Sequence, residues 1–171
     1  MRRSVAVAGS TAFFVVAPGS VAALFPWLIS RWRVEGPAAT WAAIPVRVVA
    51  AVLIAAGGAV LLHAFYRFVV EGLGTPLPAA PPERLVIGGL FRYVRNPMYV
   101  ALIAVSAGQT LLFWQLGLLW YTLAITAIPM IFVRVYEEPK LHRTFGASYD
   151  DYRANVPGWF PRLTPWHPTR T

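Results

Sequence analysis

The 171-residue sequence contains no cysteine, and only 13% of its residues are charged. Without cysteine the chain can form no disulfide, no thiolate metal site and no thiol nucleophile. Charge is also missing locally, because positions 4–30, 48–66 and 96–133 hold no Asp, Glu, Lys or Arg and are mostly apolar. Each of these runs reaches or exceeds the roughly 18–20 residues that cross a bilayer as a helix. The sequence therefore predicts an integral membrane protein and excludes disordered, collagen-like and disulfide-stapled classes.

Motifs of soluble nucleotide and metal sites are also missing. No G-x-G-x-x-G loop follows a strand-like segment, which excludes a Rossmann-type domain. The sequence has three histidines, and no two of them stand at metal-ligand spacing, so we expect no metal site. His63 falls inside an apolar run, where it has either a functional role or an interhelical hydrogen bond. His142 and His167 are expected to be solvated.

Four membrane helices are predicted, at residues 4–29, 44–70, 97–113 and 118–136. The first run is longer than the 7–15-residue core of a signal peptide, so we interpret it as a retained helix, with Pro18-Gly19 as a kink. Gly57-Gly58 would let another helix approach the second one closely. The 38-residue uncharged run is too long for one helix. Its most polar stretch, residues 114–117, predicts the turn of a hairpin, and Pro129 is expected to bend the last helix.

The predicted fold class is an all-α, polytopic membrane bundle that forms a single domain over residues 1–171. Residues 1–70 hold the first two spans, 71–96 a cytoplasmic loop, 97–136 the hairpin, and 137–171 a cytoplasmic tail with an amphipathic segment. With four spans, twelve of the fifteen basic residues share the side of both termini. The positive-inside rule then puts both termini in the cytoplasm, as in a bacterial inner membrane. The net charge of +8 is attributed to basic residues that face the membrane surface, and no nucleic-acid partner is expected.

Two clusters of residues contain more charged and aromatic side chains than the ends of membrane helices require. The second is Glu137-Glu138, directly after the fourth predicted span, where adjacent carboxylates repel and lose hydration unless a cation meets them. The first precedes and enters the third span, and in it Asn96-Pro97 fits a helix start. Its sequence is Gly88-Gly89-Leu90-Phe91-Arg92-Tyr93-Val94-Arg95-Asn96-Pro97-Met98-Tyr99. In a hairpin both clusters lie at one cytoplasmic end, so carboxylates, arginines and aromatic rings would converge on one pocket.

Both clusters match known motifs. Leu85-Val86, Gly89 and Arg95-Asn96-Pro97-Met98-Tyr99 are similar to an "LV…G.Y…RHPxY" signature. The tail is similar to an "EExxL…FGxxYxxY…vP" pattern, through Glu137-Glu138, Leu141, Phe145-Gly146, Tyr149, Tyr152 and Val156-Pro157. The combination resembles the family of isoprenylcysteine carboxyl methyltransferase and the bacterial phospholipid methyltransferases. The resemblance covers residues 83–161.

The resemblance implies methyl transfer from S-adenosylmethionine to a lipophilic acceptor drawn from the bilayer, either a phospholipid headgroup amine or a prenylcysteine-like carboxylate. Carried over by position, the cofactor-binding residues are Arg84, Leu85, Val86, Phe91, Arg95, Asn96, Pro97, Met98, Tyr99 and Glu137. The catalytic residues are Glu137, Glu138 and Arg134. Arg134 would orient the acceptor, and Glu138 would serve as a base for an amine or anchor the tail against Arg143 or Arg153. Asn96 stands where histidine is common in the family, which excludes a titrating group there.

Two other function classes remain open at this point. Membrane sterol or enone reductases that use NADPH share the "HPxY" helix start. They usually carry an acidic residue soon after it, and Val100-Ala101-Leu102 offers none. A non-enzymatic scaffold or transporter component is disfavoured because the spans hold no chain of acids or bases. The sequence leaves the acceptor and the oligomeric state undetermined.

Overall fold

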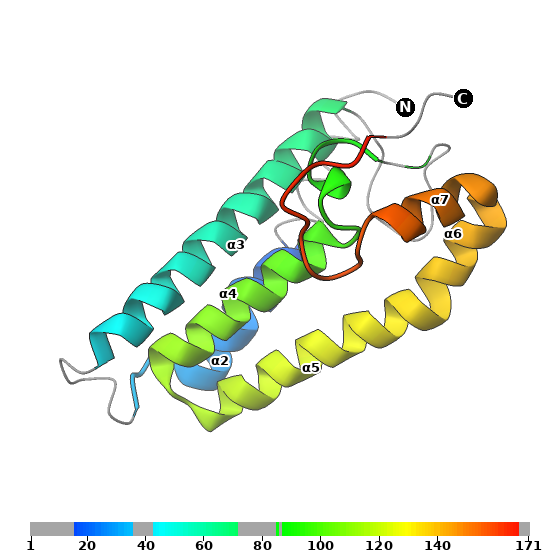
Figure 1. Ribbon diagram of the computed structural model, residues 1–171. Helices are drawn as coiled ribbons and strands as arrows, with labels where there is room; N and C mark the ends of the chain where they lie inside the picture. The colour runs from blue at the N-terminus through cyan, green and yellow to red at the C-terminus, as the bar shows by residue number, and fades with distance from the viewer. Residues whose placement is uncertain (1–15, 36–42, 72–84, 86, 168–171) are drawn as a thin grey trace.

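A computed structural model of the chain describes residues 16–35, 43–71, 85 and 87–167. Among these residues every regular element is a helix and no strand occurs, which confirms the all-α prediction (Figure 1). The helices, in chain order, are η1 (Ser20–Leu24), α2 (Phe25–Ser30), α3 (Ile44–Glu71), η4 (Gly89–Arg92), α4 (Pro97–Phe113), α5 (Leu116–Phe132), η5 (Val133–Glu137), α6 (Glu138–Phe145) and α7 (Ala147–Asn155). Segments η1 and η5 are π-helical, and η4 is one turn of 3₁₀-helix.

The predicted hairpin forms, and α4 has the predicted bounds. Trp114 ends α4 in the left-handed conformation (φ 54°), and Gln115 precedes α5 in an extended one. The Gln115 side chain donates to the Ser30 and Arg33 carbonyl oxygens at 3.1 and 2.6 Å, which fixes the turn against the end of α2. The polar residue that suggested the turn is therefore also the residue that ties it to the rest of the bundle.

The last apolar helix differs from its prediction at both ends. It begins at Leu116, not at residue 118, and the helical run continues through η5 and α6 to Phe145 instead of ending at residue 136. Hydropathy marks where the apolar surface ends, whereas a helix needs a backbone break to stop. That break comes only at Gly146, which has a positive φ of 52°. Pro129 lies inside α5, and Pro139 comes directly after the π-helical segment η5, whose altered hydrogen-bond pattern accommodates a missing N–H within the continuous helix.

Among the described helices, two are long and apolar enough to cross a membrane, Ile44–His63 and Leu116–Phe145. Val16–Ser30 and Pro97–Phe113 are apolar but shorter, so the four-span topology stays a prediction. Large apolar side chains face outward along α5, among them Trp120 and Ile128, each 65% exposed. A water-exposed helix would not carry such a surface, so the chain is a membrane protein.

Helices α3 and α4 pack at very short range (Figure 1). A Cβ atom on Gly57 would lie 2.7 Å from the Ala101 carbonyl oxygen, and one on Gly108 would lie 2.8 Å from that of Ala50. A Cβ on Gly58 would meet nothing within 4 Å. The close approach predicted from the glycine pair is therefore made by Gly57 alone, as small residues allow between membrane helices.

The π-helical segment η1 is tied to the hairpin by two side chains. A π-turn shifts the regular i→i−4 hydrogen bonds, so its carbonyl groups accept from other donors readily. The Tyr121 hydroxyl donates to the Val21 carbonyl at 2.7 Å, and Gln109 Nε2 donates to that of Ala22 at 2.8 Å. These bonds hold the first described helix against both α4 and α5.

The polar tail folds back onto the start of α4. Helices α6 and α7 meet at Gly146, and residues 156–167, here called the strap, then run beside residues 91–96 (Figure 1, red). Three backbone hydrogen bonds join the two segments: Arg95 N–H to Pro157 O, Arg162 N–H to Tyr93 O and Trp166 N–H to Arg92 O, at 2.9–3.0 Å. The two sequence clusters are thus brought together at one end of the bundle.

Candidate functional site

The tail is built on its own small apolar core. Tyr149, Tyr152 and Val156 are only 1–3% exposed, and partly buried side chains pack on them from the segment before α4, from α6 and from the strap: Leu85, Ile87, Leu141, Phe145 and Trp166. Spacing i, i+3 puts both tyrosines on one face of α7. The Tyr152 hydroxyl donates to the Phe91 carbonyl at 2.7 Å. Burial raises the pKa of both tyrosine hydroxyls, so they stay neutral hydrogen-bond donors at physiological pH.

A buried ion pair joins the first cluster to the second. Arg95 Nη1 donates to Glu138 Oε1 at 2.7 Å and to the Tyr149 hydroxyl at 3.1 Å. The Arg95 and Glu138 side chains are 14% and 12% exposed. The other oxygen of Glu138 lies 3.2 Å from Nη2 of Arg153 on α7, a half-exposed side chain. Both oxygens of Glu138 are therefore occupied by guanidinium groups.

Asn96 stands at the predicted helix start but does not cap it with its side chain. Asn96 is the residue before Pro97, the first residue of α4, and makes no side-chain cap hydrogen bond. Its Nδ2 donates instead to the Gly158 carbonyl of the strap at 3.1 Å. A Cβ on Gly158 would lie 3.2 Å from Arg95 Nη2, so the strap approaches this segment as closely as a glycine permits. The sequence motif contained no signal for Gly158, because the bond is to its backbone.

Glu137 differs from its neighbour Glu138. Its Oε2 atom is buried and has no hydrogen-bond partner in the described part of the chain, and Arg95 Nε is in the same state. The Glu137 carboxylate lies close enough to the Tyr99 hydroxyl to interact with it electrostatically. The Tyr99 ring lies 6.4 Å from that of Trp159 on the strap. One unpaired carboxylate oxygen thus belongs to a residue that interacts with Tyr99 at the start of α4.

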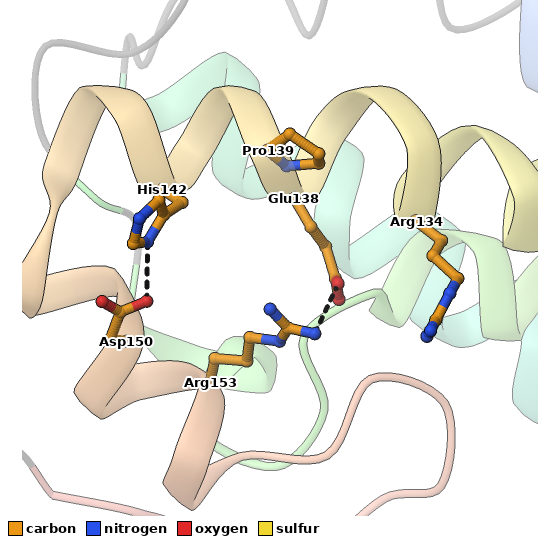
Figure 2. Close-up of a pocket in the computed structure, with 6 residues that line it drawn as sticks. All are labelled: Arg134, Glu138, Pro139, His142, Asp150 and Arg153. Carbon is orange, nitrogen blue, oxygen red and sulfur yellow. Dashed lines mark hydrogen bonds and ion pairs between the residues drawn. The ribbon is translucent and has the colours of Figure 1, made fainter.

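An open pocket of about 360 Å³ lies between the helical run after α5 and helix α7 (Figure 2). Its lining residues are Arg134, Glu138, Pro139, His142, Asp150 and Arg153. His142 Nδ1 pairs with Asp150 at 2.8 Å across its outer side, where both side chains are exposed. Among the residues that the structure describes, the Arg134 side chain has no hydrogen bond or ion pair. Its guanidinium group lies on the same side of the helix as the Glu138 carboxylate (Figure 2). Glu137 does not line this pocket.

The remaining predicted residues are placed as follows. Pro97 is buried and Met98 half-buried at the start of α4, and Leu85 contacts the tail core. Arg84 and Val86 lie outside the described residues. His63 is exposed on α3. The described residues contain no group of three or more metal-binding side chains.

The chain matches a known protein family. The sequence profile of the phospholipid methyltransferase family matches residues 46–148, from the first turn of α3 into α7. The match covers the close-packed pair α3–α4, the hairpin, both carboxylates of the second cluster and Arg134. No curated protein matches the chain.

Proposed function

Because the chain belongs to the phospholipid methyltransferase family, we propose that it transfers a methyl group from S-adenosylmethionine to a lipophilic acceptor held in the membrane. The observation that best supports the proposal is the buried, unpaired oxygen of Glu137 beside Tyr99. Leaving a buried carboxylate oxygen without a partner costs free energy, so a cationic ligand is the natural complement.

The residues around Glu137 fit the chemistry of this cofactor, which carries an ammonium, a sulfonium and a carboxylate. Glu137 Oε2 would accept a charge-assisted hydrogen bond from the ammonium. The rings of Tyr99 and Trp159 offer π faces to the sulfonium. Arg95 Nε, which is also buried and has no partner among the described residues, is a donor suited to the carboxylate. The cofactor, when bound, supplies an electrophilic methyl group.

The chain itself would act mainly by positioning and by excluding water. Methyl transfer is an in-line displacement, so its rate depends on alignment of acceptor and methyl group in a desolvated site. The strap covers the segment before α4 through its hydrogen bonds to residues 92–96. Asn96 makes one of these bonds through its side-chain amide, and the Phe91 carbonyl accepts a separate bond from Tyr152 on α7, so both residues would shape the cofactor site through the tail.

The two carboxylates and Arg134 would have separate roles. Glu138 is bound by Arg95 and Arg153, which suits an anchor for the tail. With both oxygens bound, Glu138 is not free to act as a base for an amine acceptor. Arg134 lies in the open pocket one helical turn earlier, where a guanidinium would orient an anionic acceptor group such as a phosphate or a carboxylate.

A direct assay tests the function. Purified protein would be incubated with cofactor labelled on the methyl carbon and with total membrane lipids, and the labelled lipid would be identified. We expect one class of labelled lipid from the native protein and at least tenfold less from Glu137→Gln. Absence of any labelled lipid, or equal labelling by the variant, would contradict the proposal.

A further inference from the structure

Two apolar side chains of the strap have no covering group in the structure. Phe160 is 84% exposed and Leu163 is 99% exposed. The two tryptophans of the strap, by contrast, face inward: Trp159 lies against Tyr99, and the Trp166 ring lies 5.7 Å from that of Tyr152. The strap therefore presents one apolar side to the protein and a second apolar side outward.

The position of the strap indicates what would cover this outward side. Its backbone is bonded to residues 92–95, directly before α4 begins. The contact between Trp159 and Tyr99 places it beside the first turn of α4. Because α4 and α5 form a hairpin, the same end of the bundle carries the last outward apolar residues of the α5 run, among them Val135, 71% exposed. Phe160 and Leu163 thus lie at the same end of the bundle as the last outward apolar residues of the α5 run.

We propose that Phe160 and Leu163 insert into the interfacial layer of the lipid bilayer, so that the strap is a membrane-surface anchor. The position of Arg162 between the two exposed residues suits this layer, since basic residues are enriched at the cytoplasmic membrane surface. The net charge of +8 adds attraction to anionic lipids. The anchor would hold Trp159 and the Gly158 carbonyl over Tyr99 and Asn96. The proposal does not depend on methyl transfer.

Because the chain contains no cysteine, single cysteines can be introduced at will. Phe160→Cys and Leu163→Cys remove only exposed side chains, so the inward contacts of the strap remain. The matched control is Ala154→Cys, an exposed position on α7, a helix with two aspartates. Each variant would carry an environment-sensitive fluorophore and be reconstituted in vesicles of phosphatidylcholine and phosphatidylglycerol. Quenching by lipids with a spin label near the headgroup end of the acyl chain reports insertion.

We expect blue-shifted emission at positions 160 and 163, with quenching several-fold stronger than at position 154. Quenching at positions 160 and 163 that is no stronger than at position 154 would overturn the proposal, because the strap would then lie no deeper in the bilayer than the exposed face of α7. A second copy of the chain is the other candidate cover. In that case emission at 160 and 163 would be blue-shifted but unquenched by the labelled lipid, and unlabelled Leu163→Cys would form disulfide-linked dimers on oxidation, which would also overturn the proposal.

Discussion

Arg95 and Glu138 form a 2.7 Å ion pair between residues 43 positions apart, and both side chains are more than 80% buried. The pair joins the segment that leads into α4 to the helical run that leaves α5. It also separates the roles of two adjacent carboxylates, since Glu138 is held by two guanidinium groups while a Glu137 oxygen is left unpaired. The predictions below follow from that asymmetry and from the packing that supports it.

The two arginines that bind Glu138 are expected to contribute unequally to stability. Arg95→Gln leaves a largely buried carboxylate with one partner and breaks the bond to Tyr149, so it should lower the free energy of unfolding by about 1–3 kcal/mol. Arg153 is half exposed, and Arg153→Gln should cost about 1 kcal/mol or less. Thermal unfolding in detergent measures both. Equal losses of unfolding free energy in the two variants would show that the largely buried pair stabilises the protein no more than the half-exposed one.

Substitution of Glu137 should affect mainly cofactor binding, whereas substitution of Glu138 should affect mainly stability. We expect Glu137→Gln to weaken S-adenosylmethionine binding by about 10–100-fold, the loss of one charge-assisted hydrogen bond in a desolvated site. Thermal stability should be unchanged or higher, because a buried unpaired charge is removed. Glu138→Gln should show the reverse pattern, with a clear loss of stability and a smaller change in intrinsic affinity. Identical behaviour of the two variants in calorimetry and thermal unfolding would disprove the assignment.

Adjacent glycines on α3 supply a matched pair for the helix packing. Gly57→Ala forces a methyl group to within 2.7 Å of the Ala101 carbonyl oxygen and 2.8 Å of a Val105 methyl. Overpacking of this kind costs about 1–3 kcal/mol. Gly58→Ala meets nothing and should be neutral or stabilising by up to about 1 kcal/mol, through helix propensity. The order of unfolding temperatures checks this, and a less stable Gly58→Ala would show that the wrong face of α3 has been assigned to the contact.

If the chain crosses the membrane four times, as the sequence predicts, twelve of the fifteen basic residues lie on the side of both termini, and the positive-inside rule puts that side in the cytoplasm. A single cysteine at Thr171 should therefore react with a membrane-impermeant maleimide only after the cells are opened. A cysteine at Arg33, between the first two predicted spans, is the control that should react from outside. Labelling at Thr171 in intact cells would refute the four-span arrangement.

Sequence patterns located α3 and α4 well, because hydropathy and breakers act locally, whereas residues 4–15 of the first predicted span lie outside the described residues. Pro97 fixed the start of α4, and the polar residues at 114–115 marked the hairpin turn. The end of the last helix was misjudged, since loss of hydropathy does not break a backbone that continues to Gly146. The site was harder to predict. The hydrogen bonds from Asn96 to Gly158 and from Tyr152 to Phe91 are accepted by backbone carbonyl groups. Every residue has such a group, so no residue type in the sequence predicts these acceptors. Of the two anchors considered for Glu138, Arg143 and Arg153, only the fold identified Arg153.

The central claim, a methyltransferase cofactor site around Glu137, is tested most directly by calorimetry on the purified protein in detergent. S-adenosylmethionine, its demethylated product and NADPH would be titrated separately. The account predicts saturable binding of the first two, both of which carry the ammonium that Glu137 would accept, and no response to NADPH. Saturable binding of NADPH with no response to S-adenosylmethionine or its product would contradict it.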